Sequence, residues 1–243
     1  MPDRIKKRLL PIGFLLCGFA LFGFAAAAPV KAQTFIRRSQ PQVQTPHVTI
    51  PDNANFAKGK SFEFIPPGKA QNGMTLDVWE KVKTGERQRP TFYDDDLDIV
   101  SMEVARQWNR LYNLAKNQDL KIRLKYVNNF FNQWPAGLDE KLWGVEDYWA
   151  NPWEFMAYGG DCEDYAIAKF YALKTLGVPA KDLCLVIADD FKAMITHVVL
   201  VVMDPNGRDF YVLDNTTEVI YRNGASAKLV PRYFLNEQNV WRP

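Results

Sequence analysis

A cysteine at the start of a predicted helix is the residue of this sequence best placed for covalent chemistry. Two glycines at 159–160 precede Asp161, a residue type that often caps helices, and Cys162 follows directly. Apolar side chains then recur at helical spacing, at Ile167, Phe170, Tyr171 and Leu173. Gly177 and Pro179 mark the end of the helix. Free backbone N–H groups and the helix dipole would favour the thiolate of Cys162, which is a nucleophile.

Cys162 also has structural explanations. A cysteine is often a small buried apolar residue. It could instead form a disulfide with Cys184, the only other cysteine after residue 32. Both alternatives stay open on the cysteine alone, so the residues downstream decide how it is interpreted.

Beyond this helix the apolar pattern changes from helical to strand periodicity. Residues 183–188, 197–203 and 209–214 are predicted strands, and because both of their faces are apolar, the sheet should be buried. An Asn-Gly pair at 206–207 predicts a tight hairpin between the last two strands. The region after the helix is therefore expected to be a buried, largely antiparallel sheet.

The predicted hairpin brings a histidine near an aspartate. In the register that a two-residue loop imposes, His197 lies opposite Thr216, and Asp214 is on the same face one diagonal position away. A slip of one residue would move Asp214 to the other face. A lone histidine in a buried strand is usually structural. With Cys162, however, His197 and Asp214 would complete a nucleophile, a base and an orienting acid.

Helices are also predicted ahead of the cysteine, at about 75–83, 97–114 and 120–134, from apolar residues three and four apart. The run Asp94-Asp95-Asp96 before the second helix could cap it or bind a cation, and capping is the commoner use of such a run. Aromatic residues are dense between 143 and 155. They could belong to the core or wall the cleft of the nucleophile.

The N-terminal part has the composition of an export signal. Residues 1–32 combine a basic start, a long apolar run and a small-residue cleavage pattern, although an uncleaved membrane anchor is the alternative. The remaining chain has 25 basic and 27 acidic residues, a formal net charge of −2, so nothing indicates nucleic-acid binding. We predict a signal peptide at 1–32, a linker or irregular extension at 33–74, and one domain at 75–243.

Several motifs together resemble the bacterial transglutaminase-like cysteine peptidases, in particular the LapG-type periplasmic proteases that release large surface adhesins. The similar segments are 147–154, 160–169, the strand that begins with His197, and 213–215. The resemblance implies an α+β, papain-like/transglutaminase-like fold with N-terminal helices packed on an antiparallel sheet. It also implies that Cys162 is the nucleophile, His197 the general base and acid, and Asp214 the orienting acid.

The resemblance further implies calcium dependence, through Asp161 and Glu163 and also Asp164. Calcium takes six to eight oxygen ligands, so these three carboxylates within one helical turn would need others, for example from the 144–154 loop. On the residues alone, Asp161 could simply cap the helix while the other acids complement its dipole. Calcium is thus expected from the resemblance and not from the spacing.

The implied biology is a periplasmic, calcium-dependent cysteine endopeptidase that cleaves a surface adhesin and so controls cell attachment and biofilm dispersal. The implied second partner is an inner-membrane receptor that senses cyclic-di-GMP and sequesters the protease. Two alternatives remain: a catalytically inactive, calcium-stabilised binding module of the same fold, and a transglutaminase, in which an amine replaces water as acyl acceptor. An intact set of Cys162, His197 and Asp214 disfavours the first.

Overall fold

The computed structural model describes residues 56–59, 62–65, 74–92 and 102–243. The predicted signal at 1–32, most of the 33–74 segment and the acidic run at 94–96 lie outside the described residues. Among the described residues, no helix has both the length and the apolarity needed to span a bilayer.

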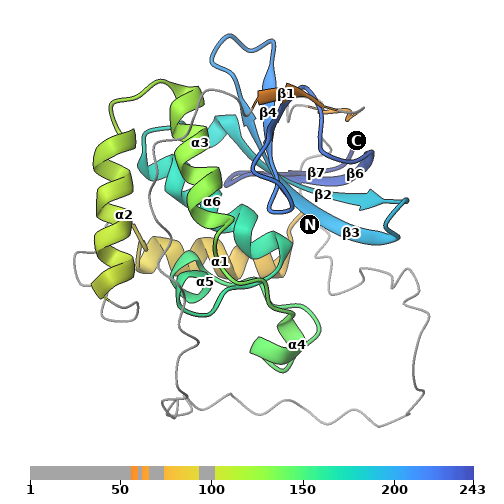
Figure 1. Ribbon diagram of the computed structural model, residues 1–243. Helices are drawn as coiled ribbons and strands as arrows, with labels where there is room; N and C mark the ends of the chain where they lie inside the picture. The colour runs from red at the N-terminus through yellow and green to blue at the C-terminus, as the bar shows by residue number, and fades with distance from the viewer. Residues whose placement is uncertain (1–55, 60–61, 66–73, 93–101) are drawn as a thin grey trace, which may run out of the picture.

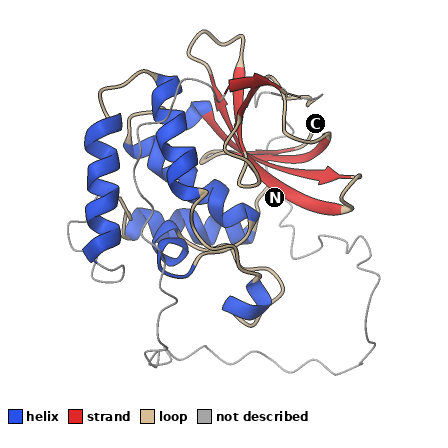
Figure 2. Cartoon of the chain, in the orientation of Figure 1, coloured by secondary structure: helices blue, strands red, loops and turns tan. Residues whose placement is uncertain are grey.

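A group of helices lies against one face of a seven-stranded sheet (Figures 1 and 2). The helices are α1 (Asp77–Gln88), α2 (Met102–Ala115), α3 (Leu120–Phe131), α4 (Asp139–Leu142), α5 (Pro152–Tyr158) and α6 (Cys162–Thr175). The three longer helices predicted ahead of the cysteine are present as α1, α2 and α3. The short α4 and α5 were not predicted, because four and seven residues carry too little periodicity to recognise.

The strands follow the order β1-β5-β4-β3-β2-β6-β7 across the sheet. They are β1 (Phe56–Lys58), β2 (Leu183–Asp190), β3 (Ile195–Met203), β4 (Phe210–Leu213), β5 (Ile220–Arg222), β6 (Leu229–Leu235) and β7 (Val240–Trp241). Neighbouring strands are antiparallel except β1 and β5, which are parallel. The two long strands β2 and β3 lie near the middle of the sheet, beside α6 (Figure 1).

Both faces of the sheet are buried, as the apolar strands predicted. Leu185, Ile187, Val198 and Leu200 pack with the helices in one apolar cluster. The alternate residues of the same strands pack in a second cluster on the other face. Helix α6 is buried along almost its whole length, which explains why its apolar residues do not form a single stripe.

Part of the segment predicted as a linker or irregular extension belongs to the sheet. Phe56–Lys58 pairs with β5, and Phe62 is buried in the second cluster. The indole N–H of Trp241 donates to the backbone oxygen of Ile65 at 2.9 Å. Sequence analysis did not reveal this strand because alternation cannot be recognised over three residues.

The predicted hairpin register is confirmed, but the predicted two-residue Asn206-Gly207 turn is wrong. The N–H of Gly207 donates to the oxygen of Asp204 and that of Asp204 to the oxygen of Asp209, so residues 205–208 form a longer loop with the same centre. Leu200 pairs with Leu213 and Met203 with Phe210, which is the alignment that sets His197 against Thr216. The last β3–β4 pair is Leu200–Leu213, so Asp214 begins the segment that leaves the sheet. The hairpin therefore delivers an acidic residue to the exit of β4, beside the first residues of β3.

Candidate active site and cation site

Two glycines shape the approach to Cys162. Gly159 has φ 78°, and a Cβ there would lie 2.1 Å from the backbone oxygen of Pro135. A Cβ at Gly160 would lie 2.1 Å from Oδ2 of Asp164. The backbone N–H of Gly137 donates to the oxygen of Gly160 at 2.9 Å, so the chain before α6 is fixed against the 135–137 segment. Larger residues at these two positions would displace the first turn of α6 and the nucleophile with it.

Cys162 lies in that first turn, partly exposed, with its side chain against the beginning of β3. Burial raises the pKa of Cys162 well above its ordinary value, and the nearby Glu163 carboxylate raises it further; the backbone N–H of Val198 acts in the opposite direction. The Cys162 Sγ lies 3.2 Å from Oε2 of Glu163. Without a bound cation, burial and the Glu163 carboxylate therefore act against the thiolate that the helix start was expected to favour.

The disulfide alternative is wrong, because Cys162 and Cys184 are both free. Cys184 is the second residue of β2 and is buried, and its thiol faces the backbone oxygen of Leu185. Its environment is that of an apolar core residue.

His197 and Asp214 form a buried hydrogen-bonded pair. The distance from His197 Nε2 to Asp214 Oδ1 is 3.0 Å. Asp214 also accepts hydrogen bonds from the backbone N–H and hydroxyl of Thr216 and from the hydroxyl of Ser226, at 2.9, 2.8 and 2.6 Å. Burial alone would raise the pKa of Asp214, but His197 and these donors hold it below its ordinary value. A charged Asp214 thus fixes the imidazole through Nε2 and leaves Nδ1 as the nitrogen available to a thiol.

The thiol and the imidazole come from adjoining elements. Cys162 is placed at the start of α6 against the backbone of Val198, the residue that follows His197 in β3. Asp214 is placed by the exit of β4. Helix, strand and hairpin therefore gather the three residues that sequence analysis selected around one end of the sheet.

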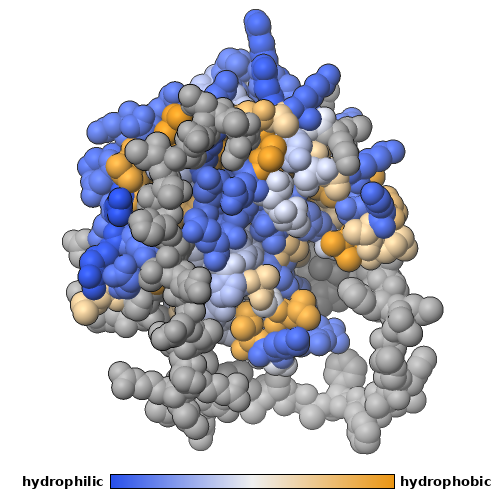
Figure 3. Space-filling view, viewed as in Figure 1, coloured by the Kyte–Doolittle hydropathy of each residue, from blue (hydrophilic) through white to orange (hydrophobic). Residues whose placement is uncertain are grey.

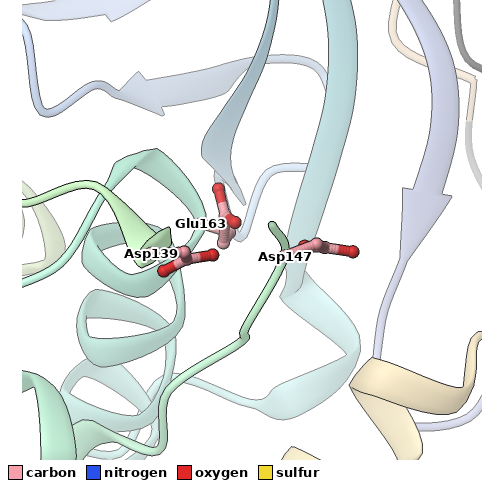
Figure 4. A group of neighbouring side chains, drawn as sticks. All are labelled: Asp139, Asp147 and Glu163. Atoms are coloured by element: carbon pink, nitrogen blue, oxygen red, sulfur yellow. The ribbon is translucent and has the colours of Figure 1, made fainter. Parts of the chain in front are cut away.

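A group of carboxylates surrounds the start of α6 (Figure 4). One carboxylate oxygen from each of Asp139, Asp147 and Glu163 lies within 4.8 Å of the others. A second such group combines Asp139 with Asp161 and Asp164. The side chains come from α4, from the loop that follows it, and from α6 and its N-cap residue Asp161. Asp147 belongs to the loop from which further oxygens were expected, whereas Asp139 was missed because nothing in the sequence links it to α6.

The carboxylates raise one another's pKa values. Burial raises the pKa of Asp139 to about 6, and the charges of Asp161 and Asp147 contribute in the same direction. The pKa values of Asp161, Glu163 and Asp164 are also raised, in each case first by burial. Buried carboxylates without a compensating cation are costly. This crowding is the electrostatic signature of a site for a hard cation.

Unpartnered oxygens agree with such a site. Oδ1 of Asp139 and Oδ1 of Asp161 are buried, and neither has a hydrogen-bond partner among the described residues. Buried polar atoms are normally paired, so two orphaned carboxylate oxygens in one group fit a metal ligand set. The residues present therefore fit calcium.

Asp164 is engaged differently from the other acids. Its Oδ1 accepts the backbone N–H of Ala150 at 2.8 Å and its Oδ2 that of Asp161 at 3.2 Å. The second bond is half of a capping box between Asp161 and Asp164. The expected capping by Asp161 is thus present as a box shared with Asp164, and Asp164 also joins the loop at 150 to the first turn of α6.

The aromatic segment before α6 divides between the two predicted roles. Trp149 and Phe155 are buried in the core. Trp143 and Tyr148 stack with ring centroids 4.4 Å apart and are only half-buried. Around α4 the surface is hydrophobic, with Leu138 and Val145 exposed (Figure 3). An apolar surface therefore lies next to the carboxylate group.

Comparison with known proteins gives a consistent set of matches. The family model described as bacterial transglutaminase-like cysteine proteinase matches residues 97–242. The solved structure of Legionella pneumophila LapG is 31% identical with a TM-score of 0.52, and the match covers 67% of this chain and 86% of that one. Its calcium-bound form matches at 31% identity over the same shares with a TM-score of 0.51.

An EGTA-treated form of Legionella pneumophila LapG matches at 31% identity and a TM-score of 0.52, over 68% of this chain and 84% of that one. No curated protein matches. Together with the helices and the mostly antiparallel sheet, the structural matches confirm the predicted transglutaminase-like, papain-like fold.

Proposed function

The chain belongs to the bacterial transglutaminase-like cysteine proteinase family and is a cysteine peptidase, and we propose that it is an exported, calcium-dependent endopeptidase that cleaves a large surface adhesin. The observation that carries the proposed chemistry is the 3.0 Å hydrogen bond between His197 Nε2 and Asp214 Oδ1. His197 belongs to β3, the strand whose backbone the Cys162 thiol contacts at Val198. We assign Cys162 as nucleophile, His197 as base and acid, and Asp214 as orienting acid.

In the proposed reaction, His197 accepts the thiol proton of Cys162 through Nδ1, and Sγ attacks the carbonyl carbon of a peptide bond. The tetrahedral intermediate collapses, the C–N bond breaks, and His197 gives the proton to the leaving amine. Water then attacks the thioester while His197 accepts its proton, the C–S bond breaks, the acid product leaves, and His197 returns the proton to Sγ of Cys162. Asp214 holds the imidazole and stabilises its charged form during both steps.

The first turn of α6 supplies a donor for the oxyanion. Backbone N–H groups at a helix start have no partner within the helix. The N–H of Cys162 lies in this turn and would face the carbonyl oxygen of a substrate attacked by Sγ.

Calcium would be held by Asp139, Asp147, Asp161 and Glu163, with Asp164 as a further candidate. When bound, it supplies positive charge that offsets the carboxylates and orders the start of α6. The solved LapG structures include a calcium-bound and an EGTA-treated form, which supports assigning this ion. Among this chain's own residues, Glu163 connects the carboxylate group to the nucleophile, because its Oε2 contacts the Cys162 thiol.

The proposed setting is the periplasm, reached through the signal predicted at 1–32, with a catalytic domain at 75–243 whose sheet is extended by β1 from the 33–74 segment. The proposed partners are the adhesin substrate and an inner-membrane cyclic-di-GMP receptor that sequesters the protease. The family of the chain and its likeness to LapG support the adhesin as substrate, and the composition of residues 1–32 supports export.

Cleavage of an exported adhesin fragment tests the proposal. The purified chain should cleave the fragment in calcium and stop in chelator, while Cys162→Ala should be inactive and the matched thiol variant Cys184→Ala active. Products are read by mass spectrometry with a primary amine present, which distinguishes a hydrolysed end from transamidation. A folded wild-type chain that binds the fragment in calcium without cutting it would support the inactive binding module instead.

A further inference from the structure

The segment that carries Asp214 is fastened to helix α3. Nδ2 of Asn132 donates to the backbone oxygen of Asp214 at 3.0 Å and to that of Thr217 at 2.8 Å. One turn earlier, Nδ2 of Asn128 donates to the backbone oxygens of Thr217 and Glu218, at 3.2 and 3.3 Å. Residues four apart lie on one face of a helix, so the two amides together grip the 214–218 segment.

The 214–218 segment depends on these side-chain hydrogen bonds because it lies beyond the end of the β3–β4 ladder. The β3–β4 ladder ends at the Leu200–Leu213 pair, and Asp214 is the next residue. The carbonyl of Asp214 is therefore held by an α3 side chain in place of a neighbouring strand. The carboxylate of the same residue must still reach His197 with hydrogen-bond geometry.

A buried lysine completes the arrangement. Lys169 is 1% exposed, and its Nζ donates to Oδ1 of Asn128 at 2.8 Å. It lies two helical turns after Cys162 on α6, and therefore on the same side of the helix. Burial lowers the pKa of Lys169 to about 7, while the charge of Asp214 acts to keep the ammonium protonated. A buried ammonium without a nearby negative charge would be costly, and the carboxylate of Asp214 provides that charge for Lys169.

We propose that Asn128, Asn132 and Lys169 are positioning residues, which hold the 214–218 segment so that the Asp214 carboxylate fixes the His197 imidazole for the Cys162 thiol. Asn132 acts on the Asp214 backbone directly. Lys169 acts through Asn128, whose amide oxygen it holds and whose Nδ2 is thereby directed at the segment. The inference rests on the proposed peptidase function, since it assigns supporting residues to the same site.

The test is the rate at which iodoacetamide alkylates Cys162, followed by peptide mass mapping, in the full-length purified chain. Alkylation forms an S–C bond with loss of iodide and requires the thiolate, so it reports the thiol–imidazole pair without any protein substrate. Lys169→Met and Asn132→Ala are compared with Asn129→Ala, a control amide on α3 whose side-chain oxygen has no partner among the described residues. Values of kcat and KM for a cleaved peptide are measured alongside.

Both test variants should alkylate Cys162 about two- to tenfold more slowly than wild type, the effect of one lost hydrogen bond on the orienting group. The same loss should appear in kcat with KM unchanged, and Asn129→Ala should match wild type. If Lys169→Met, which removes a buried charge, does not fold, the alkylation rate and kcat of Asn132→Ala test the inference alone. Asn132 lies at the half-exposed end of α3.

Wild-type alkylation and kcat in a folded Asn132→Ala variant would overturn the inference. The proposed function itself would be refuted if iodoacetamide alkylated Cys162 of wild type no faster than Cys162 of His197→Ala. The two failures are therefore distinguishable.

Discussion

Replacing Asp139 with asparagine should have opposite effects on stability with and without calcium. At neutral pH without the ion, Asp139 is an ionised, 3% exposed carboxylate that faces Asp161 and Asp147. Its pKa is raised from 3.8 to about 6, which corresponds to about 3 kcal/mol of unfavourable free energy for the charged form. Allowing for solvent screening at this site, we take about 1–2 kcal/mol.

Asp139→Asn removes the buried charge, and with it the desolvation cost and the repulsion from Asp161 and Asp147, while keeping an oxygen to accept the backbone N–H of Tyr148, a bond of 2.6 Å in the structure. In chelator, the variant should therefore unfold about 2–8 °C above wild type. In calcium the order should reverse, because a ligand has been lost. Binding stabilises the native wild type by about 2.7 kcal/mol at a hundredfold excess over its dissociation constant.

The assay is a set of melting curves for wild type, Asp139→Asn and Glu140→Gln, each with calcium and with chelator. Glu140 is exposed and adjacent to Asp139 on α4, and its variant should follow wild type in both conditions. Equal destabilisation of Asp139→Asn in both conditions would show that Asp139 is an ordinary structural hydrogen-bond acceptor, and the assignment of the cation site would fail.

Three further predictions concern the nucleophile, its orienting acid and a buried carboxyl outside the site. Cys162→Ala should abolish cleavage with little change in melting temperature, whereas Cys184→Ala should stay active but melt lower; equal inactivity of both folded variants would contradict the assignment. Asp214→Asn should lower kcat by roughly 10²- to 10⁴-fold at unchanged fold, because the amide can no longer fix the His197 tautomer, and near-normal kcat would refute its role. Burial raises the pKa of Glu86 to about 7 against hydrogen bonds from Thr91, so ionisation favours the unfolded chain and stability falls as pH rises from about 4.5 to about 7. Glu86→Gln should remove up to about 3 kcal/mol of that fall in urea titrations at several pH values, and an unchanged pH dependence would exclude Glu86 as its source.

The pairing of His197 with Asp214 followed from sequence because the centre of a hairpin loop fixes strand register. The loop at 205–208 is longer than the predicted two-residue turn but has the same centre, so the alignment is unchanged, and the alternation of side chains then determines which residues share a face. The start of α6 was recognisable for a similar reason, since glycine, capping residue and apolar spacing all lie within a few residues of Cys162. Local rules sufficed wherever the relevant residues were close in sequence.

What the sequence did not reveal is set by contacts between distant segments. Asp139 lies 24 residues before Glu163, on a four-residue helix with no recognisable periodicity. The α3 amides that hold the 214–218 segment are more than 80 positions away from the carbonyls they bind. The pKa of Cys162 could not be inferred either, because the contribution of burial depends on how α6 packs against β3.

The structure separates the capping and ligand alternatives for the acids of α6 residue by residue. Both oxygens of Asp164 accept backbone N–H groups, so this carboxylate has a structural use whether or not calcium binds. Asp161 is the N-cap of α6 and shares a capping box with Asp164, yet its Oδ1 is buried and unpartnered among the described residues, as is Oδ1 of Asp139 in the same carboxylate group. A cap alone leaves these two oxygens unexplained, whereas a shared cation pairs both. We therefore expect the calcium response of the melting temperature to follow Asp161 and Asp139 more closely than Asp164.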